Sequence, residues 1–416
     1  MILRNENQCK FYPVFFFQIN DAMKTSIFSL TLTAILISNL SCQAQLMKDR
    51  DASGDIPFKK TVLFSDFVSE GVAVGDVNND GIIDVMAGPF WFEAPNWTKH
   101  EIYTPKLYVA EKEWSNSMLN FSLDVNQDGW IDFIRFDFPG KGVYWHENPQ
   151  GKDEHWKEHL IHETVGNESP SFYDVDGDGR KDILCGDVAN KQMIWLKSPE
   201  SKDDLTWKKY TISQPGTPGS ENFSHGLGFS DLNGDGRNDV IVREGWWESP
   251  TDVTQPDWKW HPSNLGEPSS HMYTFDFNDD GYLDVFTASA HERGIWWYEN
   301  QGDGSNQKFI RHTLTEEMSE THAIAFTDMN GDLKMDFVTG KRYYAHMKQG
   351  TGALEPAYLY WFEFVPGKDP KWLAHQIDDD SGVGLNVVAE DINNDGLTDV
   401  VLANKKGIFV FEQGKD

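Results

Sequence analysis

A nine-residue motif of oxygen-bearing side chains occurs seven times along this chain of 416 residues. In the first copy, Asp76 to Asp84, oxygen side chains stand at positions 1, 3, 5 and 9, and Gly81 stands at position 6. Carboxylates and amides on alternate residues can surround a hard cation such as calcium, and the glycine permits the sharp turn that makes them converge. We therefore expect the seven motifs to bind structural Ca2+. Their oxygen positions are Asp76, Asn78, Asp80, Asp84, Asp124, Asn126, Asp128, Asp132, Asp174, Asp176, Asp178, Asp182, Asp231, Asn233, Asp235, Asp239, Asp276, Asn278, Asp280, Asp284, Asp328, Asn330, Asp332, Asp336, Asp391, Asn393, Asp395 and Asp399.

The sixth motif departs from the others because Leu333 replaces the glycine that follows Asp332. We expect this motif to hold calcium least securely. The formal net charge of the chain is −30, and much of the acidity is concentrated in the motifs. This clustering of acidic residues indicates that the motifs bind cations. The negative net charge argues against nucleic acids and anionic membranes as partners.

The motifs recur at a period of roughly 50 residues, which is typical of propellers and solenoids. In each repeat an apolar stretch precedes the motif, a β-branched run follows it, and an aromatic segment and a segment of the Trp-x-x-His type come next. Short segments with turn residues between them and no helical periodicity indicate antiparallel strands. Four strands in each of seven repeats predict an all-β, seven-bladed β-propeller over residues 58–416. The strand at Phe58–Phe64 is expected to complete the last blade, which closes the ring and removes an exposed edge.

The sequence Asp-x-Asn-x-Asp-Gly-x-x-Asp, carried by a β repeat of this length, resembles the FG-GAP and VCBS repeat families. These families include the propellers of integrin α chains and many secreted bacterial proteins. The resemblance extends over about residues 58–414, and it implies the propeller fold and calcium binding. It says little about function, because one scaffold carries many different sites.

Histidines that break the repeat indicate a second candidate site. The residue six positions before the first Asp of each motif is expected at the mouth of the central channel, on the face opposite the calcium loops. This position is occupied by Glu168, His225 and His322 in three repeats, and His271 lies one residue later in the fifth repeat. Three neutral imidazoles and a carboxylate suit Zn2+, with a position left for water or substrate. The alternative is a ring of polar channel residues that hold water.

The segments that follow the second strand of each repeat add polar side chains to the same face, among them Arg243, His291, Arg342 and Tyr343. Cationic groups on an acidic protein favour a carboxylate or another anionic ligand.

A propeller with a histidine zinc site resembles the propeller domain of aldos-2-ulose dehydratase and, more loosely, the propeller-type ulvan lyases. The resemblance implies a carbon-oxygen lyase, either a polysaccharide lyase or a sugar dehydratase, that acts by β-elimination on a uronate-containing glycan or keto-sugar. In this mechanism zinc polarises a carbonyl or carboxylate oxygen and His291 or Tyr343 removes the proton. Arg243 or Arg342 binds the developing oxyanion. A non-catalytic, calcium-stabilised binding or adhesion propeller is the alternative hypothesis.

Other histidines and aromatic residues are assigned to the scaffold. The histidines of the Trp-x-x-His segments recur from blade to blade, so we expect them to pack between blades; they are His100, His159, His261, His312 and His375. Trp114 and the pair Trp246 and Trp247 could stack on sugar rings. Aromatic residues recur in the strands of all repeats, however, and this favours positions in the core.

The first 45 residues have the pattern of an export leader. Met23, a possible start site, is followed by a lysine, by the apolar run 27–40 and by small residues, as in a secretory signal. Cys42 resembles the acylated cysteine of a bacterial lipoprotein, and cleavage without lipidation is the alternative. Residues 46–57 are a predicted linker. We therefore expect an exported protein, either periplasmic, surface-anchored or secreted, that touches the membrane only through a lipid.

Overall fold

The structure is a computed structural model and describes residues 56–414 except 167, 268–270, 303–307, 347–348 and 368. The predicted leader at 1–45, with Cys42, and the greater part of the predicted linker lie outside the described residues. In the described part of the chain, no helix is long and apolar enough to cross a bilayer.

The described strands form successive antiparallel sets of four, which are the predicted blades. The first four blades contain β2 (Ala73–Gly75), β3 (Asp84–Ala87), β4 (Phe90–Glu93) and β5 (Thr98–Glu101); β6 (Leu119–Leu123), β7 (Asp132–Phe136), β8 (Lys141–Glu147) and β9 (Lys157–Val165); β10 (Ser171–Tyr173), β11 (Asp182–Asp187), β12 (Gln192–Lys197) and β13 (Lys208–Thr211); and β14 (Gly228–Ser230), β15 (Asp239–Val242), β16 (Gly245–Glu248) and β17 (Lys259–Pro262). The remaining blades contain β18 (Tyr273–Phe275), β19 (Asp284–Ala288), β20 (Arg293–Asn300) and β21 (Phe309–Ser319); β22 (Ile324–Thr327), β23 (Asp336–Gly340), β24 (Leu359–Val365) and β25 (Lys371–Asp378); and β26 (Val387–Glu390), β27 (Asp399–Asn404), β28 (Gly407–Gln413) and β1 (Phe58–Phe64). A single pairing of β9 with β11, at Val165 and Asp187, joins the second and third blades.

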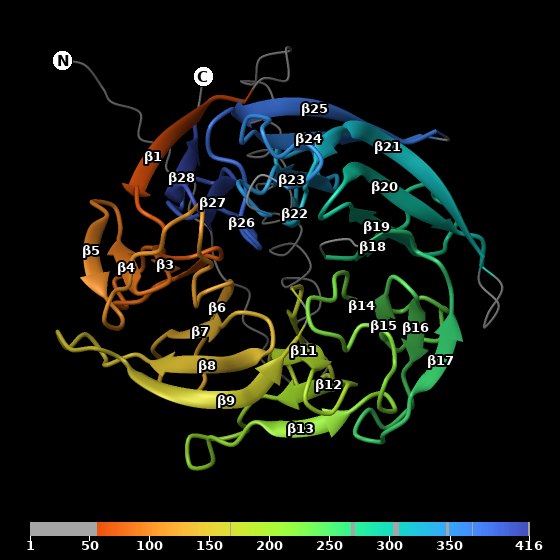
Figure 1. Ribbon diagram of the computed structural model, residues 1–416, viewed down its shortest axis with the longest axis horizontal. Coiled ribbons are helices and arrows are strands. Elements are labelled where there is room, and N and C mark those ends of the chain that lie inside the picture. Colours follow the sequence, from red (N-terminus) through yellow and green to blue (C-terminus); the bar gives the residue numbers. More distant parts are fainter. Residues whose placement is uncertain are drawn as a thin grey trace, which may run out of the picture. The chain divides into compact units, whose positions relative to one another are not determined.

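The N-terminal strand β1 completes the last blade, as predicted. It pairs antiparallel with β28, where Thr61 lies opposite Val410, and the sheet order is β1-β28-β27-β26. The last and first blades also share a core in which Val401 packs with Val85. The blades surround a common centre, with β1 beside β28 (Figure 1). The all-β propeller predicted from the repeats is confirmed.

The aspartate at position 9 of each motif shows why these sequences fold into blades. Asp84 is fully buried and accepts hydrogen bonds from the backbone N–H of Val77 at 3.0 Å and of Ala94 at 2.9 Å. One carboxylate therefore ties the motif to the residue that follows the third strand. The same pair of bonds recurs at Asp132, Asp182, Asp239, Asp284, Asp336 and Asp399.

The histidines of the Trp-x-x-His segments stack on tryptophans of the neighbouring strand. Trp91 and His100 have ring centroids 4.2 Å apart and nearly parallel planes, and the His100 Nε2 lies 3.0 Å from a Glu93 oxygen. The same arrangement holds for His159, His261, His312 and His375. These histidines do pack against aromatic rings, but the tryptophans belong to the third strand of the same blade, so the contact lies within a blade and not between blades as predicted.

Two of the three tryptophans considered as sugar-binding residues belong to the core. Trp246 and Trp247 are 2% and 1% exposed, whereas Trp114, which precedes β6, is 36% exposed. The core position favoured for Trp114 is therefore wrong, because this residue lies in a connection between blades and not in a strand.

Candidate functional site

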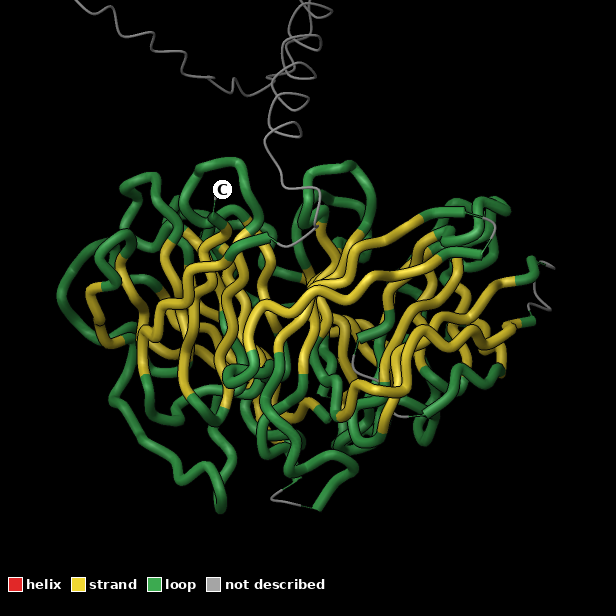
Figure 2. The backbone as a smooth tube through the Cα atoms, turned by 90° about the horizontal axis from the view of Figure 1, so that it is seen from above, coloured by secondary structure: helices red, strands yellow, loops and turns green. Residues whose placement is uncertain are grey.

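The two ends of the strands form two chemically different faces. The strands occupy a middle layer, with loops on either side (Figure 2). Each acidic motif joins the first strand of a blade to the second, so the turns between the second and third strands and the connections between blades lie at the other end. Glu168, His225 and His322 precede first strands, and His291 lies in the turn between β19 and β20. All four residues therefore belong to the face opposite the acidic loops.

Three histidines from consecutive blades converge on this face. His225, His291 and His322 each present a ring nitrogen, and the three nitrogens lie within 4.8 Å of one another. The ring centroids of His225 and His291 are 4.5 Å apart, and His322 lies 5.5 Å from the former and 5.6 Å from the latter. We call these three residues the histidine triad. The structure thus brings together two of the predicted metal ligands, and a residue predicted as a base takes the third place.

Glu168 lies against the triad, as its position in the sequence suggested. Its Oε2 is 3.6 Å from the Nε2 of His225 and 3.8 Å from that of His322. The Arg342 guanidinium donates to the same oxygen at 3.2 Å and also binds Glu70. Burial alone would raise the pKa of the Glu168 carboxyl, but His225 and Arg342 oppose this effect and lower the pKa to about 2. Glu168 is therefore an ionised carboxylate beside the three imidazoles.

The protonation and bonding of the triad fit a metal ion. Burial, reinforced by the neighbouring His225, lowers the pKa of His291 to about 4, and burial together with Arg342 lowers the pKa of His322 well below its usual range. Neutral imidazole is the form that coordinates metals. Within the described residues, the Nε2 of His225 and both ring nitrogens of His322 are buried and have no hydrogen-bond partner. Buried polar atoms normally have partners, and a coordinated ion would supply one.

A fourth histidine, His346, to which the sequence alone assigned no catalytic role, stands beside the triad. The His346 ring lies 4.4 Å from the His291 ring, and its Nδ1 is 3.3 Å from an oxygen of Glu320. Glu320 is buried and also pairs with buried Lys341. His346 itself is 34% exposed, so it combines access to solvent with an orienting carboxylate. This arrangement suits a general base.

His271 lies apart from the triad. It lines a cavity of about 610 Å³ in the channel wall with Tyr273 and Phe172, and burial lowers its pKa to about 4. His271 stands one residue closer to its acidic motif than His225 and His322 do. Successive residues of an extended chain point in opposite directions, so this offset turns the side chain away from its counterparts. The structure therefore does not group His271 with His225 and His322, and the histidine of blade five that lies beside them is His291.

The other predicted catalytic residues have different surroundings. Tyr343 packs its ring against Tyr344 and lies under the ammonium of Lys406. Arg243 is paired with its neighbour Glu244. Arg342 is buried and occupied by two carboxylates, Glu70 and Glu168. Of the three, the described contacts connect only Arg342 to the triad, and there it holds Glu168 in place.

On the opposite face, the acidic loops are folded by their own oxygens. Asp76 accepts hydrogen bonds from the N–H groups of Asp80, at 3.0 Å, and Gly81, at 2.9 Å. The carboxylates of Asp174, Asp176 and Asp182, and those of Asp328, Asp332 and Asp336, come within 4.8 Å of one another. Burial raises the pKa of the position 9 carboxyls to between about 6 and about 8; these are Asp84, Asp132, Asp182, Asp239, Asp284, Asp336 and Asp399. A cation in each loop would offset this crowding of negative charge.

The sixth loop keeps the conformation of the others despite Leu333. Leu333 has a φ of 67° and donates its N–H to Asp328 at 2.9 Å, as Gly81 does to Asp76 with a φ of 87°. Side chains disfavour this left-handed conformation. The loop therefore stores strain, but its carboxylates remain grouped.

The third loop differs more deeply, because an ammonium group lies among its carboxylates. Lys197, at the end of β12, contacts Asp176 and lies 2.9 Å from Asp178 and 3.2 Å from Glu200. The other blades have a glutamate in this place: Glu93, Glu147, Glu248, Glu299, Glu363 and Glu412. Lys197 thus supplies positive charge where a metal ion would otherwise do so.

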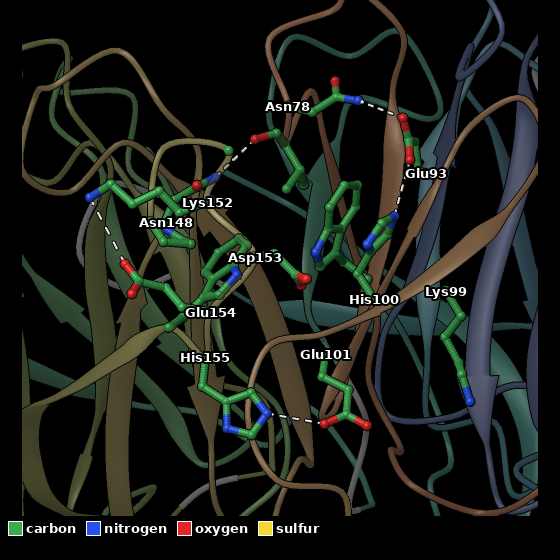
Figure 3. A pocket seen from close by; sticks show the side chains of 15 residues that line it. Asn78, Glu93, Lys99, His100, Glu101, Asn148, Lys152, Asp153, Glu154 and His155 are labelled. Carbon is green, nitrogen blue, oxygen red and sulfur yellow. Dashed lines mark hydrogen bonds and ion pairs between the residues drawn. The ribbon is translucent and has the colours of Figure 1, made fainter.

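Grooves also occur between blades on the outer side. A groove of about 660 Å³ between the first and second blades is lined by residues that include Trp156, His100, Glu101 and His155, and Figure 3 labels the last three. A groove of the same volume, lined by His312 and Trp372, lies between the fifth and sixth blades. Because the grooves repeat with the blades, we attribute them to the scaffold.

Comparisons with known proteins agree with this architecture. A model of the FG-GAP-like repeat matches residues 124–185 and 276–339, and none of the curated proteins matches the sequence. Among solved structures, BBS1N in complex with ARL6DN has a TM-score of 0.51 at 8% identity, over 87% of this chain and 97% of that chain.

Two carbohydrate-related structures also match. A lectin of Agrocybe aegerita that recognises non-reducing terminal N-acetylglucosamine has a TM-score of 0.41 at 15% identity, over 79% of this chain and 82% of that chain. A rhamnogalacturonan lyase of Bacillus licheniformis has a TM-score of 0.43 at 12% identity, over 86% and 74% of the two chains. The FG-GAP-like repeats matched at residues 124–185 and 276–339 belong to an all-β fold of the propeller type.

Proposed function

We propose that the protein is an exported carbohydrate-active lyase or dehydratase whose histidine triad holds a zinc ion. The observation that carries this proposal is the convergence of three ring nitrogens within 4.8 Å, beside an ionised carboxylate. His225, His291 and His322 would be the ligands, and Glu168 would be the fourth ligand or would bind a coordinated water. When bound, the ion would polarise a carbonyl or carboxylate oxygen of a sugar and so acidify the adjacent C–H.

The proton acceptor is His346 in this proposal. In a β-elimination, the proton passes from carbon to the His346 imidazole, and the electron pair of the broken C–H bond forms the new double bond. The bond from the β-carbon to oxygen breaks, and the departing oxygen takes a proton from solvent. Glu320, fixed by Lys341, orients the His346 ring and stabilises its charged form. Arg342 keeps Glu168 ionised and in position.

The charge balance of this region favours an anionic substrate. The buried cations Lys341, Arg342 and Lys405 are matched by three buried or nearly buried carboxylates, Glu70, Glu168 and Glu320. A divalent ion would leave the region with a positive excess on a protein whose formal net charge is −30. A uronate or a keto-sugar acid suits such a site.

Calcium is the ion we assign to the acidic loops other than the third, where Lys197 already supplies positive charge. Carboxylate and amide oxygens on alternate residues suit this cation, and the carboxylates of the sixth loop lie within the reach of one ion. Calcium would then stabilise the loops that join the first and second strands of the blades, and it would take no part in catalysis. The leader sequence is the basis for assigning an exported location.

Metal analysis combined with a product assay tests this function. Wild-type protein is expected to retain about one zinc after mild calcium chelation, and His225→Ala and His291→Ala to lose it. His271→Ala is the matched control, because His271 is also a buried histidine near the channel, and it should keep the zinc. Uronate polysaccharides and keto-sugars are then assayed for unsaturated products by ultraviolet absorbance, with His346→Gln expected to be slow but metal-loaded.

The second candidate function is a non-catalytic binding or adhesion propeller stabilised by calcium. Two exposed aromatic side chains, Trp114 and Phe223, favour it, because both lie in connections between blades on the same face as the triad. Protein that contains calcium, retains no zinc and forms no unsaturated product from any of the substrates would refute the lyase proposal and leave binding.

A further inference from the structure

Three aromatic side chains form a row on the face that carries the triad. Trp114 lies 5.7 Å from Phe138, and Phe138 lies 5.4 Å from Phe223, measured between ring centroids. Trp114 is 36% exposed, Phe223 is 44% exposed and Phe138 is half-buried. Trp114 lies in the connection β5–β6 between the first and second blades, Phe138 in the turn β7–β8 of the second blade, and Phe223 in the connection β13–β14 between the third and fourth blades. Figure 1 shows these elements. We call the three residues the aromatic row.

Both ends of the row are held in place by the protein. Phe223 has a φ of 64°, which is unusual for a bulky side chain, and its N–H donates to the carbonyl of Gly166 at 2.7 Å. Backbone strain of this kind persists only where the surroundings enforce it, and it is concentrated at functional sites. At the other end the Lys405 ammonium lies 4.9 Å from the centroid of the Trp114 ring and 5.6 Å from that of Phe67. Exposed rings held in this way are prepared for a ligand and would not lose conformational entropy on binding.

The Lys405 ammonium adds a positive charge beside Trp114, at one end of the row. It is 4% exposed, and within the described residues its Nζ has no hydrogen-bond partner. An ammonium carries three donors, so a buried one without acceptors is costly. Its positive charge favours a ligand with acidic groups.

The surroundings of Trp114 combine apolar and polar groups. A shallow surface hollow of about 340 Å³ is lined by the rings of Tyr108, Trp114 and Phe138 and by polar side chains, namely Lys106, Glu113, Ser115, Asn116 and Asp137. This volume lies within the range of small-molecule sites. A sugar ring presents an apolar face and an edge of hydroxyl groups, so an aromatic floor with a polar rim is complementary to it. A protein partner would require a larger, mainly apolar patch.

The row leads to the triad. Phe223 stands two residues before His225, and the intervening Ser224 accepts a hydrogen bond from the N–H of Glu168 at 2.9 Å. A chain bound along the row would therefore arrive at the candidate metal site.

We propose that the aromatic row is the binding track for the sugar rings of an acidic polysaccharide, which places one unit of the chain at the triad. The part of the proposal that concerns the triad rests on the proposed function, and binding along the row stands independently of it. The row defines the substrate as a polymer that spans several sugar units. A free keto-sugar would use the triad alone.

Binding measurements on variants with the triad intact test the track. Affinity electrophoresis and calorimetry are performed with polygalacturonate, alginate, chondroitin sulfate and neutral galactomannan, which separates carboxylate, sulfate and uncharged chains. Trp114→Ala and Phe223→Ala are each expected to weaken binding of at least one acidic polysaccharide about tenfold, or about 1.4 kcal/mol. Tyr282→Ala is the control, because Tyr282 is 46% exposed and belongs to an acidic loop on the opposite face, and it should bind as wild type. Thermal unfolding verifies that all three variants are folded.

The outcomes separate this inference from the proposed function. Loss of polysaccharide binding in the two row variants, together with normal binding by His225→Ala, supports the track whether or not any product is formed. The track is overturned if wild type binds none of the four polysaccharides. It is also overturned if both row variants bind as tightly as wild type, even when unsaturated products appear.

Discussion

The third acidic loop provides the sharpest test of the calcium assignment, because Lys197 lies where the other blades have a glutamate. We predict that wild-type protein does not bind calcium in this loop. In the other loops the residue at position 3 is an asparagine, and in the first loop the Asn78 amide donates to Glu93 at 3.2 Å. In the third loop both positions change together, to Asp176 and Lys197, and the two side chains form an ion pair. Burial alone would lower the pKa of Lys197, but its pairs with Asp176 and Asp178 raise it, so the lysine is charged.

Lys197→Met removes this internal cation. The Lys197 side chain is 11% exposed, and those of Asp176 and Asp178 are 15% and 29% exposed. A pair of this kind lies between a surface pair, worth about 0–1 kcal/mol, and a buried pair, whose disruption costs about 3–5 kcal/mol. We therefore expect the variant to lose about 1–3 kcal/mol of unfolding free energy in chelator. A calcium ion at about 100 times its dissociation constant would contribute about 2.7 kcal/mol, so calcium should restore the variant to roughly wild-type stability.

Two measurements check this prediction. Equilibrium dialysis with elemental analysis should show one more calcium per chain in Lys197→Met than in wild type. Urea unfolding in chelator and in calcium should show a calcium-dependent gain in the variant that exceeds the gain in wild type. The double change Asp176→Asn and Lys197→Glu, which reproduces the other blades, should also bind the additional ion. Equal calcium content in wild type and both variants would refute the reasoning that Lys197 replaces an ion.

Two further predictions concern the scaffold. Leu333→Gly should stabilise the protein by roughly 0.5–1 kcal/mol in chelator, because relief of the left-handed strain, about 1–2 kcal/mol, exceeds the entropic cost of glycine. Urea unfolding measures this change in stability. As a control, Gly331→Ala in the same loop, at a φ of 72°, should destabilise the protein. His146 is 1% exposed and stacks on Tyr103, and burial, aided by Arg135, lowers its pKa from 6.5 to about 3. Its folded state binds fewer protons than its unfolded state, so the stability that neutral His146 contributes is present above pH 6.5 and is lost as the pH falls toward about 3. His146→Phe should therefore show a shallower decline of unfolding temperature over this interval, and a decline as steep as that of wild type would contradict this explanation.

The fold could be predicted because the sequence of each repeat is sufficient to indicate its own local structure. The position 9 aspartate, the turn before it and the aromatic strand after it are all close in sequence, and their hydrogen bonds, such as those of Asp84 to Val77 and Ala94, are equally local. Even the long-range pairing of β1 with β28 followed from counting strand types. Tertiary structure in such a repeat protein is largely a sum of local units and their nearest neighbours.

The candidate site could be predicted only in part, because its members come from different types of connection. Counting back from the acidic motifs located Glu168, His225 and His322, since these share one register. The same count misplaced His271, where an offset of one residue reverses the side chain. His291 and His346 lie in turns after second strands, whose lengths differ between blades, so no count along the chain predicts their approach to His225.

The location of a residue's partners distinguishes two kinds of departure from the repeat. Lys197 departs from the pattern, but its partners Asp176 and Asp178 belong to the same blade, so the change is balanced locally and serves the scaffold. Arg342 of the sixth blade instead binds Glu70, which precedes the first blade's β2, and Glu168, which precedes β10 of the third. Because the partners of Arg342 belong to other blades, its role is not confined to one blade. The structure that all blades share is the central channel. By this criterion Lys197 and its loop belong to the scaffold of one blade, whereas Arg342 and its two carboxylates belong to the channel face, where the histidine triad lies.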